Sequence, residues 1–133
     1  MEKAKLGQEF SDQKISETFL RFAKPLIECY GVVPTKEQLE SALNIAFLIW
    51  NAVVFDAADG NSRHENELRQ HITATLPTLE RDRKIVEQMV ELMITRKKTT
   101  FGKDVRLIGD FRIIKKNGEW RLWAEARKAE FIQ

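Results

Sequence analysis

The sequence predicts an α+β domain, with about four helices around a buried central helix and a C-terminal antiparallel β-hairpin packed on them. Apolar residues recur every three or four positions as far as residue 99, which is typical of amphipathic helices. From residue 105 they alternate with polar residues, as in a half-buried strand. Asn117-Gly118 then marks a tight turn, because a type I′ turn needs positive φ at both central positions. The 133 residues are enough for one domain, which we place at 11–133.

The first helix is predicted over residues 11–30. Residues 1–10 are mixed and polar, so we expect them to be loosely ordered. Ser11 can cap the helix, since its hydroxyl can accept a hydrogen bond from a free N–H of the first turn. Pro25 removes one backbone hydrogen bond and should kink or divide the helix, which Gly31 then ends.

The central helix is predicted over residues 35–55. Thr35 and Gln38 form the capping-box pattern, in which each side chain binds the backbone N–H of the other residue. The second half of this helix is apolar nearly all round, which indicates burial on most sides. It is too short and too closely bounded by charge to span a membrane, so we expect no membrane association. Asn51 lies inside it, and we expect this amide to tie the helix to a neighbouring backbone.

Two further helices are predicted over residues 62–76 and 78–99, after a turn-rich loop at 56–62. Pro77 ends the first of these helices, and Thr78 can cap the second. The apolar positions on the inner sides of the elements predict the core, which should contain Phe19, Phe22, Leu43, Phe47, Trp50, Val54, Met89, Leu92, Phe111, Ile113 and Leu122.

A two-residue turn sets the register of a hairpin over residues 105–128. It pairs Phe111 with Ala124 on the more apolar face, which should lie on the helices, and Arg112 with Trp123 on the other face. A two-stranded ribbon alone is marginally stable in water. The ribbon must therefore pack on helices or pair with another chain, and its unpaired edge could serve a protein partner or a second copy.

Charge is unevenly spread along the chain, although the net charge is only +2. Residues 1–95 carry 11 basic against 15 acidic side chains, whereas residues 96–133 carry 11 against 5. Cations interleaved with aromatic rings suit nucleic acid, because the cations contact phosphates while the rings stack on bases. The candidate nucleic-acid contacts are Arg96, Lys97, Lys98, Arg112, Lys115, Lys116, Arg121, Trp123 and Arg127. The alternative is a solvated hairpin face, with Arg112 stacked on Trp123 and Trp120 in the core.

Two groups of side chains could bind a metal ion. His64, Glu67 and His71 have the spacing i, i+3, i+7 on one helix face, and imidazole and carboxylate groups are zinc ligands. Solvated or capping histidines are the alternative. Asp110 and Glu125 face each other in the predicted hairpin, and such a carboxylate pair could hold a metal for phosphodiester cleavage. This pair predicts, as a further alternative, a metal-dependent hydrolase.

Sequence motifs of catalysis or cofactor binding are few. The single cysteine, Cys29, excludes an internal disulfide and an all-cysteine zinc site, and we expect it to be buried. The chain has no glycine-rich phosphate loop, nucleophile elbow or Walker pattern, so no cofactor is expected. The sequence therefore favours a small cytosolic, non-catalytic binding or protein-interaction module, with nucleic-acid binding through the hairpin as the first alternative.

A resemblance to a known domain rests on the run Ala42–Asn51, the turn Arg96–Lys98 and the residues that follow it, Phe101, Asp104 and Arg106–Ile108. These segments resemble an uncharacterised bacterial helical domain, which is sometimes found with a cysteine-rich, zinc-binding tail like that of the SecA secretion motor. The resemblance covers about residues 15–127, but a chain with one cysteine cannot build such a tail. The domain has no assigned activity, so the resemblance transfers no catalytic residue.

Overall fold

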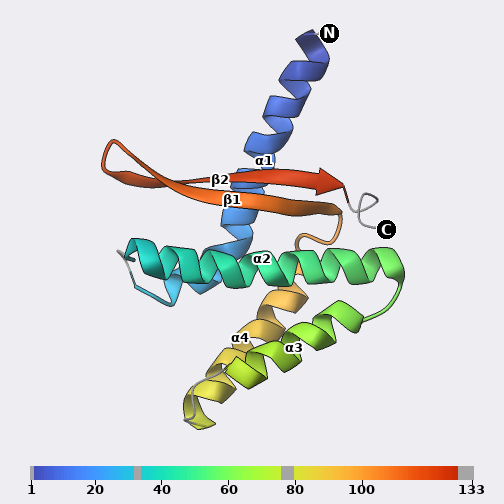
Figure 1. The fold of residues 1–133 in the computed structure, drawn as a ribbon, viewed down its shortest axis with the longest axis vertical. Coiled ribbons are helices and arrows are strands. Elements are labelled where there is room, and N and C mark those ends of the chain that lie inside the picture. The colour runs from blue at the N-terminus through green and yellow to red at the C-terminus, as the bar shows by residue number, and fades with distance from the viewer. Residues whose placement is uncertain (1, 32–33, 76–79, 129–133) are drawn as a thin grey trace.

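A computed structural model describes residues 2–31, 34–75 and 80–128, and this part of the chain forms four helices and one two-stranded antiparallel sheet. In chain order the elements are α1 (Glu2–Glu28), α2 (Lys36–Asp59), α3 (Arg63–Thr75), α4 (Glu80–Thr99), β1 (Arg106–Lys116) and β2 (Glu119–Lys128). The hairpin lies on one side of α2, and α3 and α4 lie on the other side (Figure 1). The predicted α+β fold is confirmed.

The first helix, α1, begins at Glu2, whereas the sequence predicted a start at Ser11. Residues 2–10 are mostly Glu, Lys, Ala, Leu and Gln, which have high helix propensity, and they contain no proline. Their polarity therefore does not prevent them from continuing the helix. Pro25 does not divide α1, and the chain leaves the helix through Gly31, whose φ of +96° suits glycine.

The predicted capping box at the start of α2 is confirmed. Oγ1 of Thr35 accepts a hydrogen bond from the backbone N–H of Gln38 (3.2 Å), and the Thr35 N–H donates to Oε1 of Gln38 (2.9 Å). The helix ends at Asp59 rather than at residue 55, and Gly60 follows in the left-handed conformation with φ +71°. The helical hydrogen bonds continue as far as Gly60. Residues 56–59, which the sequence predicted to be part of a loop, are therefore helical.

The core surrounds Trp50, whose side chain is fully buried. The rings of Phe22 and Phe101 pack around it, with centroids 5.3 Å and 6.0 Å from the indole. Nearly all of the predicted core residues are buried or partly buried against this cluster: Phe19, Phe22, Leu43, Phe47, Trp50, Val54, Met89, Phe111, Ile113 and Leu122.

Leu92 was predicted in the core, but it is 53% exposed. The buried row of α4 runs through Val90, Met93 and Lys97 in steps of three and four residues, and Leu92 lies off that row. The helices themselves match the prediction more closely, since α3 lies inside its predicted range and α4 ends at Thr99. The predicted cap Thr78 lies outside the described residues.

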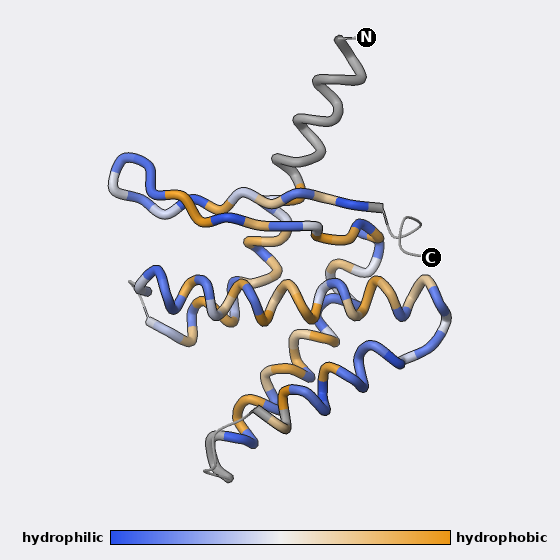
Figure 2. The backbone as a smooth tube through the Cα atoms, viewed as in Figure 1, coloured by the Kyte–Doolittle hydropathy of each residue, from blue (hydrophilic) through white to orange (hydrophobic). Residues whose placement is uncertain are grey.

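Among the described residues, α2 is the one helix long and apolar enough to cross a membrane. In its most apolar window, 50% of the residues are buried inside the fold. The core helix of a soluble protein passes the same test of length and composition. Here α2 lies between the hairpin and the α3–α4 pair, and apolar residues run along much of its length (Figure 2). The expected absence of membrane association stays a prediction.

The register of the hairpin agrees with the prediction. Phe111 lies opposite Ala124 and Arg112 lies opposite Trp123, and the turn at Asn117-Gly118 has positive φ at both positions. The more apolar face packs on α1 and α2, where Phe111 contacts helix residues of both elements with ring centroids less than 6 Å apart. The hairpin is thus fixed to the helices by its predicted inner face.

A bulge in β1 departs from the register set by the turn. One extra residue, Gly109, shifts the pairing between Ile108 and Asp110. The side chain of Arg127 on β2 lies across Gly109, where a Cβ atom would collide with its Nε and Cδ atoms. The turn alone could not reveal this bulge, because it depends on packing far from the turn.

Candidate functional site

One edge of the hairpin is held by α2 near the bulge. Nδ2 of Asn51 donates to the carbonyl of Ile108 (2.9 Å), and Oδ1 of Asn51 accepts from the Ile108 N–H (2.8 Å). A side-chain amide has one acceptor and an N–H donor, so it takes the place of a peptide group in a neighbouring strand. The indole N–H of Trp50 also donates to the Arg106 carbonyl (2.7 Å). The expected tie between Asn51 and a neighbouring backbone is confirmed.

The other edge of the hairpin is held in the same way by α1. The Ser16 hydroxyl accepts from the Ala124 N–H (2.7 Å) and donates to the Ala124 carbonyl (3.3 Å). Backbone groups that are already bonded offer nothing to an incoming strand. Each edge is therefore blocked to an incoming strand at one position, Ile108 on β1 and Ala124 near the middle of β2.

Replacing Asn51 by alanine should lower the free energy of unfolding by about 2–3 kcal/mol, because the N–H and carbonyl of Ile108 would lose their partners. Asn44→Ala, at an exposed position of the same helix, is the matched control and should change it by less than about 0.5 kcal/mol. Urea unfolding followed by circular dichroism measures both values. Equal effects of the two variants would contradict a stabilising role for the Asn51 contact.

The face of the hairpin that points away from the helices is called the outer face. Alternate residues of both strands form it: Asp110, Arg112, Ile114 and Lys116 of β1, and Glu119, Arg121, Trp123, Glu125 and Arg127 of β2. Ile114 is 49% exposed and Trp123 is 36% exposed. The guanidinium of Arg112 lies over the Trp123 ring, 5.0 Å from its centroid, as one interpretation of the sequence predicted. The outer face thus combines exposed apolar side chains with charges of both signs.

Two carboxylates on the outer face lie opposite each other. Asp110 pairs in register with Glu125, as predicted, and neither forms an ion pair within the described part of the chain. Like charges in this position are destabilising. No group of three or more Asp, Glu, His or Cys residues among those described could hold a metal ion. The structure therefore supplies no further ligand for the hydrolase interpretation of this pair.

Lys115 and Trp120 lie on the inner face close to the turn. The Lys115 ammonium is 5.2 Å from the centroid of the Trp120 ring. Trp120 is 37% exposed, so the expectation that it lies in the core is wrong. The reason is its position, because the turn end of the hairpin extends beyond the point where α1 crosses the strands (Figure 1).

Two cations of the basic turn Arg96–Lys98 are engaged by groups of the fold. Pro25 has no N–H, so the carbonyl of Arg21, four residues earlier, lacks its helical partner. Nη2 of Arg96 donates to that carbonyl (2.7 Å). Nζ of Lys98 pairs with Oε1 of Glu65 (2.9 Å). Both cations thus have partners within the fold, and their contact with nucleic acid stays a prediction.

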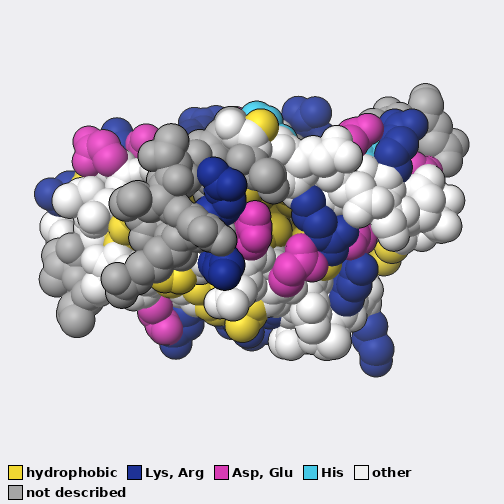
Figure 3. Space-filling view, turned by 90° about the horizontal axis from the view of Figure 1, so that it is seen from below, with side chains coloured by type: hydrophobic (Ala, Val, Ile, Leu, Met, Phe, Trp, Pro, Cys, Tyr) yellow, Lys and Arg dark blue, Asp and Glu magenta, His cyan; other side chains and the backbone are white. Residues whose placement is uncertain are grey.

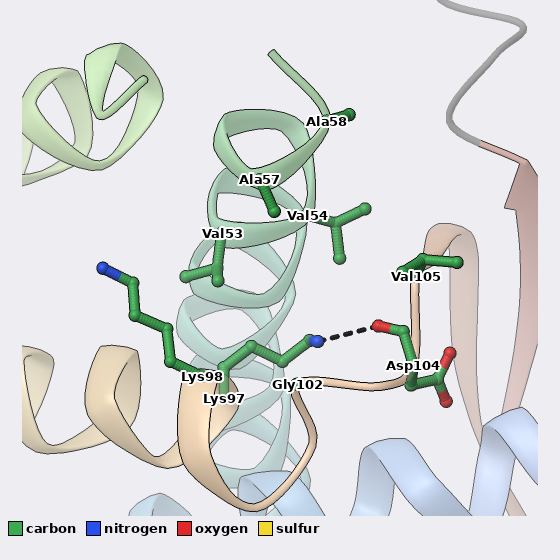
Figure 4. Close-up of a pocket in the computed structure, with 9 residues that line it drawn as sticks. All are labelled: Val53, Val54, Ala57, Ala58, Lys97, Lys98, Gly102, Asp104 and Val105. Carbon is green, nitrogen blue, oxygen red and sulfur yellow. Dashed lines mark hydrogen bonds between the residues drawn. The ribbon is translucent and has the colours of Figure 1, made fainter. Parts of the chain in front are cut away.

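Lys97, the third cation of this turn, is only 2% exposed. Its Nζ donates to the carbonyls of Phe101 (2.7 Å) and Asp104 (2.8 Å) and lies 4.4 Å from the centroid of the Trp50 ring. Burial lowers the pKa of Lys97 to about 8, although the Asp104 charge acts in the opposite direction. In Figure 4 the ammonium turns toward Asp104 beside a cavity of about 290 Å³, while Lys98, which also lines this cavity, extends to the side away from Asp104. Lys97 thus holds the chain together after α4 and cannot reach a phosphate.

The predicted metal ligands on α3 are not brought together. His64 and His71 are seven residues apart, which is about 10 Å along a helix axis. Together with Glu67 they line an open groove of about 400 Å³, but they do not form a group that could hold a metal ion. Nδ1 of His64 lies instead 2.9 Å from Oδ1 of Asp56. His64 therefore has the capping environment that the sequence left as the alternative.

Asp56, at the end of α2, caps the start of α3 and is only 1% exposed. It accepts hydrogen bonds from the backbone N–H groups of His64 and Glu65, both at 2.8 Å. Burial alone would raise the pKa of Asp56. These hydrogen bonds and the His64 side chain more than offset burial and hold the pKa of Asp56 below its ordinary value. The ionised carboxylate therefore joins the two helices.

Elsewhere the surface is electrically mixed. Seen from below, basic and acidic side chains are interspersed over the molecule (Figure 3). Ion pairs such as Arg69–Glu91 (2.6 Å) and Lys24–Glu28 (3.8 Å) contribute to this mixing. The cations that remain from the predicted nucleic-acid set are all on the hairpin: Arg112, Lys115, Lys116, Arg121 and Arg127.

Some residues of this site were not among the candidates predicted from the sequence. Ser16 and its partner Ala124 are 108 residues apart, and a serine inside a helix gives no sign of such a contact. Ile114 and Glu119 were outside the candidate set, although alternation from the turn places them on the face of Trp123. Cys29, expected to be buried, is exposed.

No protein-family model matches the chain, and no similar chain was found among curated proteins or solved structures. The resemblance to the bacterial helical domain therefore stays a prediction. The function has to be argued from the geometry of the outer face.

Proposed function

We propose that the chain is a non-catalytic interaction module that binds a protein partner through the outer face of its hairpin. The composition of that face carries the proposal. Exposed Trp123 and Ile114 lie near its middle, with Arg112 and Arg121 beside them. Tryptophan and arginine are enriched at the energetic centres of protein interfaces, and a polar rim is typical around them.

The balance of charge favours a protein over a nucleic acid as the partner. The outer face carries four basic and three acidic side chains: Arg112, Lys116, Arg121 and Arg127 against Asp110, Glu119 and Glu125. A phosphate backbone would meet these carboxylates as well as the cations, whereas a protein surface can complement both signs. The three cations of the Arg96–Lys98 turn add nothing, because the fold itself engages them.

A photoreactive amino acid in place of Ile114 tests the proposal in the cells that make the protein. The control replaces Ile85, which is exposed to a similar degree on α4. We expect one adduct of defined mass at position 114 and none at position 85. Arg121→Glu should remove the adduct, because it reverses a charge beside the crosslinking position. The proposal is wrong if position 114 gives no adduct or if both positions give the same adducts.

Titration with short single- and double-stranded oligonucleotides tests the nucleic-acid alternative. The exposed indoles of Trp120 and Trp123 provide the fluorescence signal. Under the proposal, their fluorescence shows no saturable change. Saturable quenching that weakens steeply with added salt would overturn the proposal, because that salt dependence is the signature of phosphate contacts.

A further inference from the structure

The outer row of β2 is complementary to itself when its direction is reversed. In chain order the row reads Glu119, Arg121, Trp123, Glu125 and Arg127. Reversal about Trp123 places Arg121 on Glu125 and Glu119 on Arg127. Each acidic position therefore falls on a basic one, and the tryptophan falls on itself.

We infer that the partner of the outer face is a second copy of this chain, packed face to face with the two β2 strands antiparallel about Trp123. The inference rests on the proposed function and names its partner. A two-fold axis at Trp123 makes the interface isologous, so each contact occurs twice. Arg121 of one copy faces Glu125 of the other, and the two indoles meet at the axis.

The dimensions of stacked sheets are compatible with these contacts. Along a strand, Arg121 and Glu125 are each about 7 Å from Trp123. Two sheets that pack about 10 Å apart and cross at about 30° displace these positions sideways by only about 3–4 Å. Long arginine and glutamate side chains can span that displacement. Glu119 and Arg127 are about 14 Å from the axis, so their pairs contribute less.

The facing carboxylates of the outer face, of which Oδ1 of Asp110 accepts a hydrogen bond from the Phe111 N–H (2.8 Å), are a second observation in favour of this partner. Asp110 and Glu125 lie opposite each other with no ion pair among the described residues. Arg112 stacks on Trp123, and Arg127 lies across Gly109, so neither neutralises the pair in the single chain. In the dimer, Arg121 of the second copy places a cation beside Glu125 of the first copy.

The closed edges of the hairpin direct the second copy to the face. Ser16 satisfies the N–H and carbonyl of Ala124 at the middle of β2, and Ser16 belongs to α1, which occupies this edge. A second β2 strand centred on Trp123 therefore cannot join the sheet by its edge. A second copy that stacks on the outer face forms no backbone hydrogen bond with the first copy. The two β2 strands can therefore still lie antiparallel to each other in that arrangement.

Charge reversal tests the inference by sedimentation velocity over about a hundredfold range of concentration. We expect the wild-type chain to associate with itself. Arg121→Glu and Glu125→Arg should each raise the dissociation constant at least about tenfold, because each variant sets like charges opposite each other twice. An equimolar mixture of the two variants should associate again, because the new carboxylate of one then faces the new guanidinium of the other.

Lys24→Glu is the matched control, since it reverses an exposed charge on α1 and should leave the association unchanged. Circular dichroism establishes that every variant is folded. A wild-type chain that stays monomeric over the whole range would overturn the inference, and so would a mixture that associates no better than the separate variants. A monomeric wild type that still gives the adduct at position 114 would overturn the dimer and leave the proposed function standing.

Discussion

Replacing Trp50 by alanine is expected to lower the free energy of unfolding by about 4–6 kcal/mol, the largest effect of any single substitution considered. The indole is fully buried between the rings of Phe22 and Phe101, so its loss leaves a cavity at the centre of the core. The Arg106 carbonyl also loses the donor that holds the start of β1, and the Lys97 ammonium loses the ring beneath it. Urea unfolding followed by circular dichroism measures the change.

Two variants make the Trp50 result interpretable. Trp50→Phe keeps a ring but removes the N–H, so it should fold with an intermediate loss of stability even if the alanine variant does not fold. Trp120→Ala removes the same type of side chain from a position that is 37% exposed, and it should change the free energy of unfolding by less than about 1 kcal/mol. Similar losses for Trp50→Ala and Trp120→Ala would contradict the central place of Trp50.

Asp56→Asn is expected to have the second largest effect, a loss of about 2–4 kcal/mol at neutral pH. The buried carboxylate accepts hydrogen bonds on both oxygens, from His64 on Oδ1 and from the Glu65 N–H on Oδ2. An asparagine has one acceptor oxygen, so its amide N–H₂ would face a donor that it cannot bind. Asp59→Asn changes an exposed carboxyl near the same helix end and should be nearly neutral.

The pH dependence of stability tests whether the Asp56 carboxylate is ionised in the folded protein. The pKa of Asp56 is lower in the folded protein than its ordinary value of 3.8, so the unfolded chain takes up the proton at higher pH. The contribution of Asp56 is complete above that ordinary value and disappears as the pH falls through the folded pKa. Between neutral and acidic pH, wild type should therefore lose more stability than Asp56→Asn. Parallel curves for the two proteins would contradict an ionised cap.

The parts of the fold that depend on local chemistry could be predicted from the sequence. The positive φ angles required by Asn117-Gly118 set the hairpin register, and this register then placed Arg112 against Trp123. The Thr35 capping box likewise depends on residues three positions apart. In both cases the interacting groups lie close in sequence, so a pattern determines the geometry without knowledge of the rest of the molecule.

The basic turn Arg96–Lys98 shows why the candidate site was harder to predict. Its charges indicated a surface for phosphates, but their partners are carbonyls and a carboxylate from distant parts of the chain. One signal was available, since Lys97 falls four residues after Met93 on the buried row of α4. Arg96 had no comparable signal, because the carbonyl that it binds is free only through Pro25 in another helix.

The hydrogen bonds between Ser16 and Ala124 also bear on how the protein is made. They join the first helix to the last strand across 108 residues, and Phe19 on the same helix packs against Phe111 of the hairpin. While the ribosome is still producing the helical part, the hairpin that covers this side of α1 does not yet exist. The apolar surface on this side of α1 therefore stays uncovered until Ala124 has emerged. A chain stalled before β2 is accordingly the form most exposed to chaperones and proteases.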